Sequence, residues 1–182
     1  MIRFEKVSWE EYRKSYAEFV DEVCPCADID EEAVRFDYDH IKLPERSTSG
    51  SAGYDFFAPF NFNVYTHDTT PVAHPTGIRF VTDRDDVFLA CVPRSGLGFK
   101  HNLMLRNTLG VIDSDYQYSD NEGHIKVKMS ACHNLLIKPG NAFMQGIILP
   151  FLKTDDDYCI NTRNGGFGST DKNIEVSSGK TE

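Results

Sequence analysis

Residues 125–131 are Ile-Lys-Val-Lys-Met-Ser-Ala, and apolar and polar side chains alternate along this stretch. Because successive side chains of a β-strand point to opposite faces, a period of two predicts a strand with one buried face. Two other stretches, 87–92 and 145–149, are largely apolar, as expected of strands buried on both faces. Short strands between loops rich in Gly, Pro and Asp indicate an all-β domain, either a jelly roll or a β-barrel.

The 182 residues predict one β domain, over residues 33–160, with a segment added at each end. Residues 1–32 form an N-terminal extension whose last five residues are an acidic, solvated connector. Residues 161–182 are rich in Gly, Ser, Thr and Asn, which predicts a flexible C-terminal arm.

A helix is predicted within the N-terminal extension. Ser8-Trp-Glu-Glu11 is a capping box, and the apolar residues that follow lie on one helical face. Pro25 cannot continue a helical hydrogen-bond ladder, so the helix is expected over about residues 8–23.

Composition excludes several classes of partner and location. The formal net charge is −9, and an acidic chain repels nucleic acid, so neither DNA nor RNA is an expected partner. No stretch reaches the roughly 18 apolar residues of a membrane span, and the charged N-terminus differs from a signal peptide. A cytoplasmic protein without membrane contact is therefore expected. The odd number of cysteines, five, predicts reduced, mostly buried thiols.

Three segments carry residue types that suit chemistry. The stretch 93–98, Pro-Arg-Ser-Gly-Leu-Gly, could hold an anion or could simply be a turn. In 110–117, two carboxylates lie two residues apart, so on a strand both would face a water or a metal, or both could be exposed in a turn. Asn107 could recognise a nucleobase edge or cap a turn. In 163–170 a lone aromatic, Phe167, could stack on a planar ligand or dock on a nearby surface.

Five segments, in this order, resemble the five motifs of the trimeric dUTP diphosphatase (dUTPase) family. They are Ser51-Ala-Gly-Tyr-Asp55, Pro93-Arg-Ser-Gly-Leu-Gly98, Gly110-Val-Ile-Asp-Ser-Asp-Tyr116, Phe143-Met-Gln-Gly-Ile-Ile148 and Gly165-Gly-Phe-Gly-Ser-Thr170. The resemblance extends from about residue 35 to residue 170 and leaves out the N-terminal helix.

The resemblance implies Mg²⁺-dependent hydrolysis of dUTP to dUMP and diphosphate by a homotrimer with its sites between subunits. Asp113 is implied to orient the attacking water, and Tyr116 is implied to pack under the deoxyribose and exclude a 2′-hydroxyl. The ion would be held mainly by the triphosphate and water, with Asp55 at most an indirect contact. The implied substrate-binding residues are Arg94, Ser95, Gly96, Asn107, Gly110, Val111, Ile112, Tyr116, Lys126, Gln145, Arg163, Phe167, Gly168 and Ser169.

The sequence also departs from the family pattern. Residues 118–122 lengthen the hairpin tip before Gly123, Ala142 stands where an Arg is usual, and Arg163 lies one residue closer to the double glycine. The sequence leaves two alternative functions. A dCTP deaminase has the same fold, but it is expected to need a catalytic Glu in the pocket, and the segment 112–116 favours a diphosphatase. A nucleotide-responsive binding module could use the aromatic face of the N-terminal helix, although such a face usually covers its own core.

Overall fold

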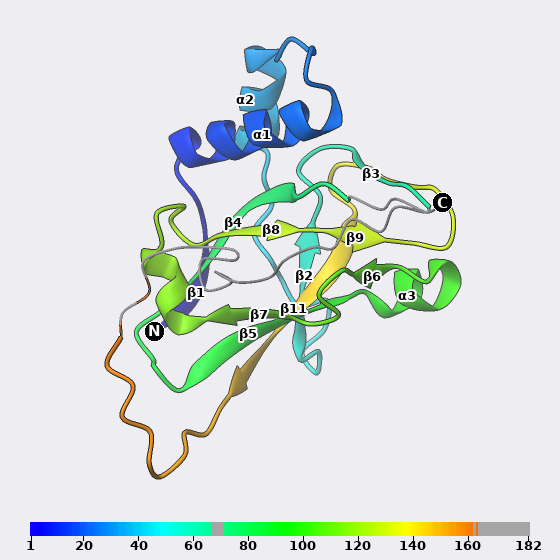
Figure 1. Cartoon of the computed structure of the whole chain (residues 1–182). Helices are drawn as coiled ribbons and strands as arrows, with labels where there is room; N and C mark the ends of the chain where they lie inside the picture. The colour runs from blue at the N-terminus through cyan, green and yellow to red at the C-terminus, as the bar shows by residue number, and fades with distance from the viewer. Residues whose placement is uncertain (67–70, 162, 164–182) are drawn as a thin grey trace, which may run out of the picture.

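The structure is a computed structural model and describes residues 1–66, 71–161 and 163 (Figure 1). Its elements, in chain order, are β1 (Ile2–Lys6), α1 (Trp9–Val23), α2 (Glu31–Asp39), β2 (Gly53–Phe57), β3 (Phe62–Val64), β4 (His74–Thr82), β5 (Val87–Pro93), α3 (Ser95–His101), β6 (Met104–Leu105), β7 (Gly110–Asp113), a 3-10 helix η1 (Ser114–Tyr118), β8 (His124–Val127), β9 (Met129–Ser130), β10 (Leu135–Ile137) and β11 (Ala142–Pro150). The described part of the chain is therefore mainly strands, as the sequence predicts.

The strands form antiparallel sheets. One sheet has the order β1-β4-β8, another has the order β2-β11-β5-β7, and β10-β3 and β6-β9 form two short pairs. No closed barrel is formed by the strands of the described residues, so this form of the expected fold is not found. The reason lies in the hairpin between β7 and β8. The pair β6-β9 joins the two arms of this hairpin at one end. Beyond that pair, β7 hydrogen-bonds to β5 and β8 hydrogen-bonds to β4, so the two arms belong to different sheets.

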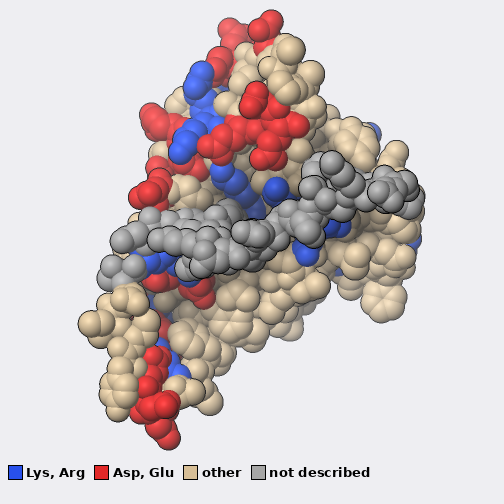
Figure 2. All heavy atoms as spheres, viewed as in Figure 1, with Lys and Arg blue, Asp and Glu red and all other residues tan. Residues whose placement is uncertain are grey.

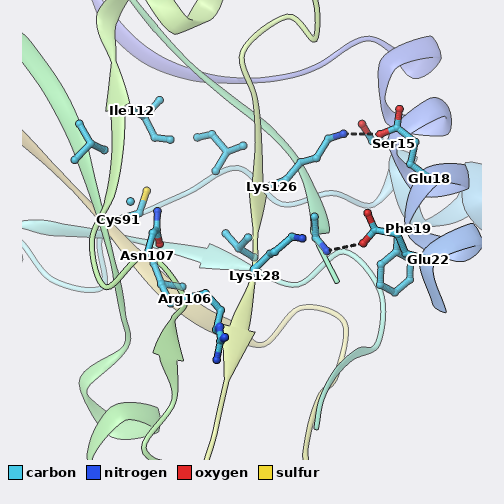
Figure 3. Close-up of a pocket in the computed structure, with 16 residues that line it drawn as sticks. Ser15, Glu18, Phe19, Glu22, Cys91, Arg106, Asn107, Ile112, Lys126 and Lys128 are labelled. Atoms are coloured by element: carbon cyan, nitrogen blue, oxygen red, sulfur yellow. Dashed lines mark hydrogen bonds and ion pairs between the residues drawn. The ribbon is translucent and has the colours of Figure 1, made fainter. Parts of the chain in front are cut away.

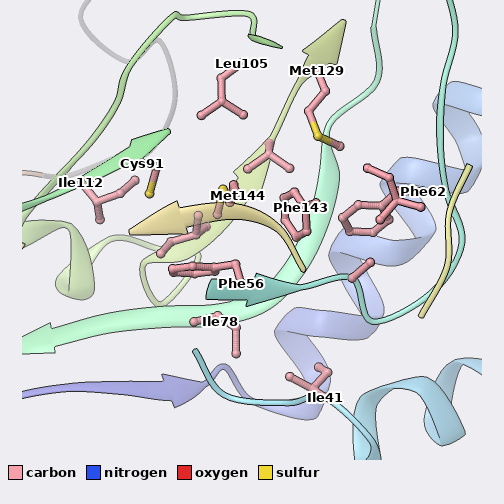
Figure 4. Close-up of a cluster of buried hydrophobic side chains, with 14 of the residues drawn as sticks. Ile41, Phe56, Phe62, Ile78, Cys91, Leu105, Ile112, Met129, Phe143 and Met144 are labelled. Atoms are coloured by element: carbon pink, nitrogen blue, oxygen red, sulfur yellow. The ribbon is translucent and has the colours of Figure 1, made fainter. Parts of the chain in front are cut away.

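The core lies between the sheets and is rich in aromatic rings (Figure 4). Phe62 packs against Phe143 with ring centroids 5.1 Å apart, an edge-to-face contact that aromatic pairs favour. The alternation at residues 125–131 is confirmed at its centre, since Ile125, Val127 and Met129 are buried. The stretch 145–149 is less buried than predicted, because its last residues lie at the end of β11 and reach the surface.

Helix α1 has the boundaries that its capping box predicts. The Ser8 Oγ accepts a hydrogen bond from the Glu11 N–H, and the helix ends at Val23, before Pro25. Its aromatic face packs on the chain's own core: Tyr12 is fully buried, and the Phe19 ring lies 5.2 Å from the Phe60 ring. The face is therefore an internal cover over one end of the β structure (Figure 1).

Two elements near the N-terminus were not predicted. Residues 2–6 form the edge strand β1, which pairs with β4. Ile2 and Phe4 alternate with charged residues there, but the stretch is too short for its period to predict a strand and its bounds. Residues 31–39 form α2, so the connector expected through residue 32 and the β pattern expected from residue 33 are wrong there. The cause is local: Asp30 caps the helix by accepting hydrogen bonds from the Glu32 and Ala33 N–H groups.

The cysteines also differ from expectation. All five are free thiols, but only Cys91 is buried, and the other four are exposed. The prediction of mostly buried thiols is wrong because these four belong to loops or chain ends, where composition does not determine burial. Within residues 1–66, 71–161 and 163, no helix is long and apolar enough to cross a membrane.

Candidate active site

A cavity of about 430 Å³ opens between strands β7 and β8 (Figure 3). It exists because the two strands separate above the β6-β9 pair, each following its own sheet. The structure brings five of the predicted substrate-binding residues together in its lining: Asn107, Gly110, Val111, Ile112 and Lys126. These residues come from both arms of the hairpin, so the cavity is a property of the hairpin as a whole.

Helix α1 forms a further wall of this cavity, which the sequence analysis missed. Ser15, Glu18, Phe19 and Glu22 line it from the helix (Figure 3). Their spacing places them on one helical face, and that signal is present in the sequence. Which surface the face would cover could not be predicted, because that depends on contacts over about 100 residues of chain. Arg106 and Lys128 also line the cavity and were not predicted.

The cavity combines an apolar floor with charged edges. Burial raises the pKa of the Cys91 thiol to about 12, so this thiol stays protonated and unreactive near neutral pH. The Lys126 ammonium is 2.7 Å from a Glu18 carboxylate oxygen. In Figure 2, acidic side chains gather over α1 and α2, and basic side chains lie in the band just beneath them. The base of a nucleotide could therefore enter a mainly apolar space bounded by polar groups.

Asp113 and Asp115 lie at the end of β7. The strand stops at Asp113 and the 3-10 helix η1 begins at Ser114, so of the two alternatives the strand that carries both carboxylates does not apply. Both still converge on one partner: the Arg163 guanidinium donates to Asp113 Oδ2, and its Nε donates to Asp115 Oδ1 over 3.0 Å. The same guanidinium lies 5.7 Å from the centre of the Tyr116 ring. Arg163 thus contacts the acidic pair in this structure.

Tyr116 is held beneath the hairpin by its phenol group. The hydroxyl donates to the His124 carbonyl oxygen over 3.0 Å and accepts a hydrogen bond of 2.8 Å from the Asn121 side chain. Burial raises the pKa of Tyr116, so the phenol remains a neutral donor at neutral pH. Asn121 belongs to the inserted residues 118–122, none of which lines the described cavity. The insertion therefore supports Tyr116 without covering the cavity.

The predicted phosphate-binding residues form a second group. Ser95 and Gly96 are exposed at the first turn of the short helix α3, where a loop was expected, and Arg94 directly precedes them. The helix forms because the Leu97 and Gly98 N–H groups bond back to the Arg94 carbonyl. These three residues line a separate cavity of about 540 Å³.

Asp55 organises this second group. The residue is 5% exposed, and its carboxylate accepts hydrogen bonds from Ser47 (2.9 Å) and Gln145 (3.0 Å). Arg94 Nε lies 3.3 Å from the same carboxylate. Asp55 therefore fixes the side chains of Arg94 and Gln145, because both are anchored to one buried anion.

The two cavities share no lining residue. One chain thus carries one group of predicted site residues at the hairpin and a second group at α3. Phe167, Gly168 and Ser169, and with them most of the C-terminal arm, lie outside the described residues. Among the described residues there is no group of three or more His, Cys, Asp or Glu side chains that could hold a metal ion.

Comparisons with known proteins show which family this chain belongs to. The family model for dUTPase matches residues 39–171. A deoxyuridine 5′-triphosphate nucleotidohydrolase of Lactococcus lactis is 37% identical over 135 residues, which cover 71% of this chain and 88% of that protein. One from Coxiella burnetii is 34% identical over 141 residues, covering 72% of this chain and 88% of that protein.

Solved structures lead to the same family. The dUTPase of Streptococcus mutans, at 33% identity, superposes with a TM-score of 0.55 and covers 62% of this chain and 88% of that chain. A dUTPase of Staphylococcus bacteriophage 80alpha has a TM-score of 0.57 and covers 90% of this chain and 99% of that chain, but its identity of 13% shows the fold alone. On the family match and on the curated relatives, this chain belongs to the dUTPase family.

Proposed function

We propose that this protein hydrolyses dUTP to dUMP and diphosphate. One observation carries the proposal beyond family membership: Asn107, Gly110–Ile112 and Lys126 line a single cavity, and the segment that follows Ile112 carries Asp113 and Tyr116. The reaction keeps uracil out of DNA and supplies dUMP for thymidylate synthesis.

The base and sugar are bound at the hairpin. The Asn107 amide offers a donor and an acceptor to the uracil edge, and backbone groups of Gly110, Val111 and Ile112 complete the recognition. Tyr116 packs under the deoxyribose and leaves no room for a 2′-hydroxyl. Phe167, Gly168 and Ser169, which lie outside the described residues, belong to the same proposed set of substrate-binding residues.

Asp113 acts on the attacking water. It accepts a proton from the water as the oxygen attacks the α-phosphorus, and diphosphate leaves from the opposite side. In this structure the Arg163 guanidinium donates a hydrogen bond to the Asp113 carboxylate. The triphosphate draws Arg163 to the γ-phosphate, because a triphosphate is a stronger anion than two carboxylates, and this frees Asp113.

Arg94, Ser95, Gly96 and Gln145 bind the phosphates. Their hydrogen-bond donors suit a triphosphate that itself carries Mg²⁺, since Mg²⁺ typically keeps waters and phosphate oxygens as ligands. Both oxygens of Asp55 already accept protein hydrogen bonds, so Asp55 would contact the ion only through water. When bound, the ion would neutralise charge on the phosphate oxygens.

The working form is a homotrimer with sites between subunits, and its location is cytoplasmic. Support for shared sites comes from the separation of the two cavities in one chain. A base-side group of one subunit that meets a phosphate-side group of another would complete the site.

The test is diphosphate release from dUTP, UTP, dCTP and dTTP with Mg²⁺, with the products separated by chromatography. We expect release from dUTP only, with dUMP as the nucleotide product. Conversion of dCTP to dUTP would instead show a deaminase. Folded protein that is inactive on the whole panel would contradict the proposal.

A further inference from the structure

Helix α1 is fixed to the return strand of the hairpin by three polar contacts. The Ser8 N–H and Oγ donate to the Glu122 carboxylate over 2.8 and 2.6 Å. His124 Nδ1 lies 3.0 Å from Glu11 Oε1. Lys126 Nζ lies 2.7 Å from Glu18 Oε2. The helix therefore contacts the same segment that lines one side of the cavity between β7 and β8.

The spacing of these contacts shows that helix and strand run side by side. Residues 8, 11 and 18 lie on one helical face. His124 and Lys126 are alternate positions of β8 and therefore point to the same side of the strand, and Glu122 belongs to the turn just before the strand. The contacts follow the same order along both segments, so the face of α1 meets the turn first and then the strand.

The middle contact is a buried polar cluster. His124 is fully buried, and Glu11 and Ser15 are 6% and 2% exposed. Ser15 Oγ donates to Glu11 Oε1 over 2.7 Å and lies 3.1 Å from His124 Nδ1. The Gly77 N–H donates to His124 Nε2 over 2.8 Å, so Nδ1 carries the ring proton and points at Glu11.

Gly77 is required for this arrangement. Its φ is +71°, and a Cβ there would lie 2.3 Å from the Ile41 side chain. The N–H that fixes the imidazole thus belongs to a position that only glycine can occupy without strain.

Charges in the cluster are complementary. Burial would raise the pKa of Glu11, but hydrogen bonds from His124 and Ser15 outweigh it, and the net pKa is lowered. Burial lowers the pKa of His124. A carboxylate thus accepts from a neutral imidazole, and removal of either partner leaves a buried polar group unpaired, which is costly.

The cluster leads directly to Tyr116. The His124 carbonyl oxygen accepts a hydrogen bond from the Tyr116 hydroxyl, and the His124 ring is held by Glu11 and Gly77. The position of the phenol therefore depends on the position of His124, which α1 fixes.

We propose that Glu11, Ser15 and His124 are positioning residues that make α1 a working part of the nucleotide site, because they hold β8 and, through it, the Tyr116 ring that discriminates deoxyribose from ribose. The inference rests on the proposed function and extends it to a helix outside the residues that the dUTPase family model matches.

The experiment compares kcat/KM for dUTP with kcat/KM for UTP in Glu11→Ala, Glu11→Gln and the matched control Glu10→Ala. Glu10 is exposed on the same helical turn. We expect the dUTP/UTP ratio to fall about fivefold or more in Glu11→Ala, the size expected when a buried charged partner is lost. Glu11→Gln, whose side-chain oxygen can still accept from His124, recovers most of the ratio, and Glu10→Ala leaves it unchanged.

An equal loss of kcat/KM for dUTP and UTP in folded Glu11→Ala would mean that the helix is only a structural support, and it would overturn the proposal. Hydrogen–deuterium exchange over residues 114–127 needs no nucleotide and is measured on the same proteins. We expect faster exchange in Glu11→Ala than in Glu10→Ala, and unchanged exchange also overturns the proposal. Failure of the wild-type protein to hydrolyse dUTP would count against the proposed function alone.

Discussion

At the scale of single residues, the acidic pair Asp113 and Asp115 shares one cationic partner, Arg163, with the Tyr116 ring. Asp113 and Asp115 contact the same guanidinium although they belong to different elements, a strand and a 3-10 helix. One cation therefore lies between the two carboxylates. The two acids can nevertheless have different tasks, because only Asp113 is proposed to contact the attacking water.

The variant Asp113→Asn should lose turnover of dUTP by roughly 100- to 10,000-fold, the usual contribution of a positioned base. Binding of a non-hydrolysable dUTP analogue should change little, because the amide has nearly the same shape. Steady-state kinetics and calorimetry measure the two effects. Asp120→Asn, at an exposed position of the hairpin tip, is the control and should be fully active. Near wild-type turnover in Asp113→Asn would exclude Asp113 as the base.

His74 makes folding stability depend on pH. Its ring is 3% exposed and lies 4.6 Å from the Phe62 ring. Burial lowers the pKa of His74 from 6.5 to about 4. Above pH 6.5 the folded and unfolded chains are both neutral at this residue. As the pH falls from 6.5 towards 4, only the unfolded chain gains the proton, so the folded state loses up to about 3 kcal/mol.

Urea unfolding near neutral pH and near pH 4.5 should therefore show a smaller pH-dependent loss in His74→Phe than in wild type. Phenylalanine keeps the aromatic packing and removes the titration. His40→Gln, at an exposed position, should retain the wild-type difference. The same loss in His74→Phe as in wild type would place the relevant protonation elsewhere in the chain.

At the scale of elements, the hairpin is held open and supported from outside. Its two arms belong to different sheets, and the inserted residues 118–122 turn toward α1, where Glu122 accepts from Ser8. Glu122 and Gly123 both have positive φ, at +58° and +75°. This turn sets the direction in which His124 and β8 leave the insertion.

Gly123→Ala should destabilise the fold by about 1–3 kcal/mol, because a side chain at positive φ is strained and the added Cβ would lie 2.7 Å from the Gln117 Cα. Thermal unfolding followed by circular dichroism measures the loss. Gly50→Ala, where no atom lies within 4 Å of the added Cβ, is the control and should be nearly neutral. Equal stability of the two variants would show that the turn can rearrange at little cost.

At the scale of the whole molecule, the described residues carry two separate cavities that hold predicted site residues. One lies between β7, β8 and α1, and the other lies at α3. We propose that they are complementary halves of a site shared between subunits. Sites shared between subunits allow two inactive variants to complement each other, since each supplies the half that the other lacks.

We expect co-expressed Asp113→Asn and Arg94→Ala chains to recover activity, although each variant alone is inactive. Random mixing should restore about a quarter of the wild-type sites, the chance that both halves of a site are intact. Activity of the purified mixed oligomer, with oligomeric state from light scattering, is the measurement. Mixed oligomers that form and stay inactive would place each complete site within one chain.

The sequence alone determined those features that depend on neighbouring residues. Alternation at residues 125–131 predicted β8 and β9, and the capping box predicted where α1 begins, because a strand's period and a helix cap are local. The order of five short motifs identified the family, and it placed Asn107 and Gly110–Ile112 in one functional group that the structure finds around one cavity. Local patterns were ambiguous at α2 and at η1, where caps and turns outweighed the apparent alternation.

Only the tertiary structure decided which surfaces meet. Nothing near Glu11 in the sequence indicates that it would hold His124, because that contact joins residues 113 positions apart. The same holds for the α1 wall of the cavity, for Asp55 holding Arg94 and Gln145, and for the separation of the two cavities. The physical reason is that such contacts form only when sheets and helices pack. Burial and geometry then determine charge, hydrogen bonding and shape.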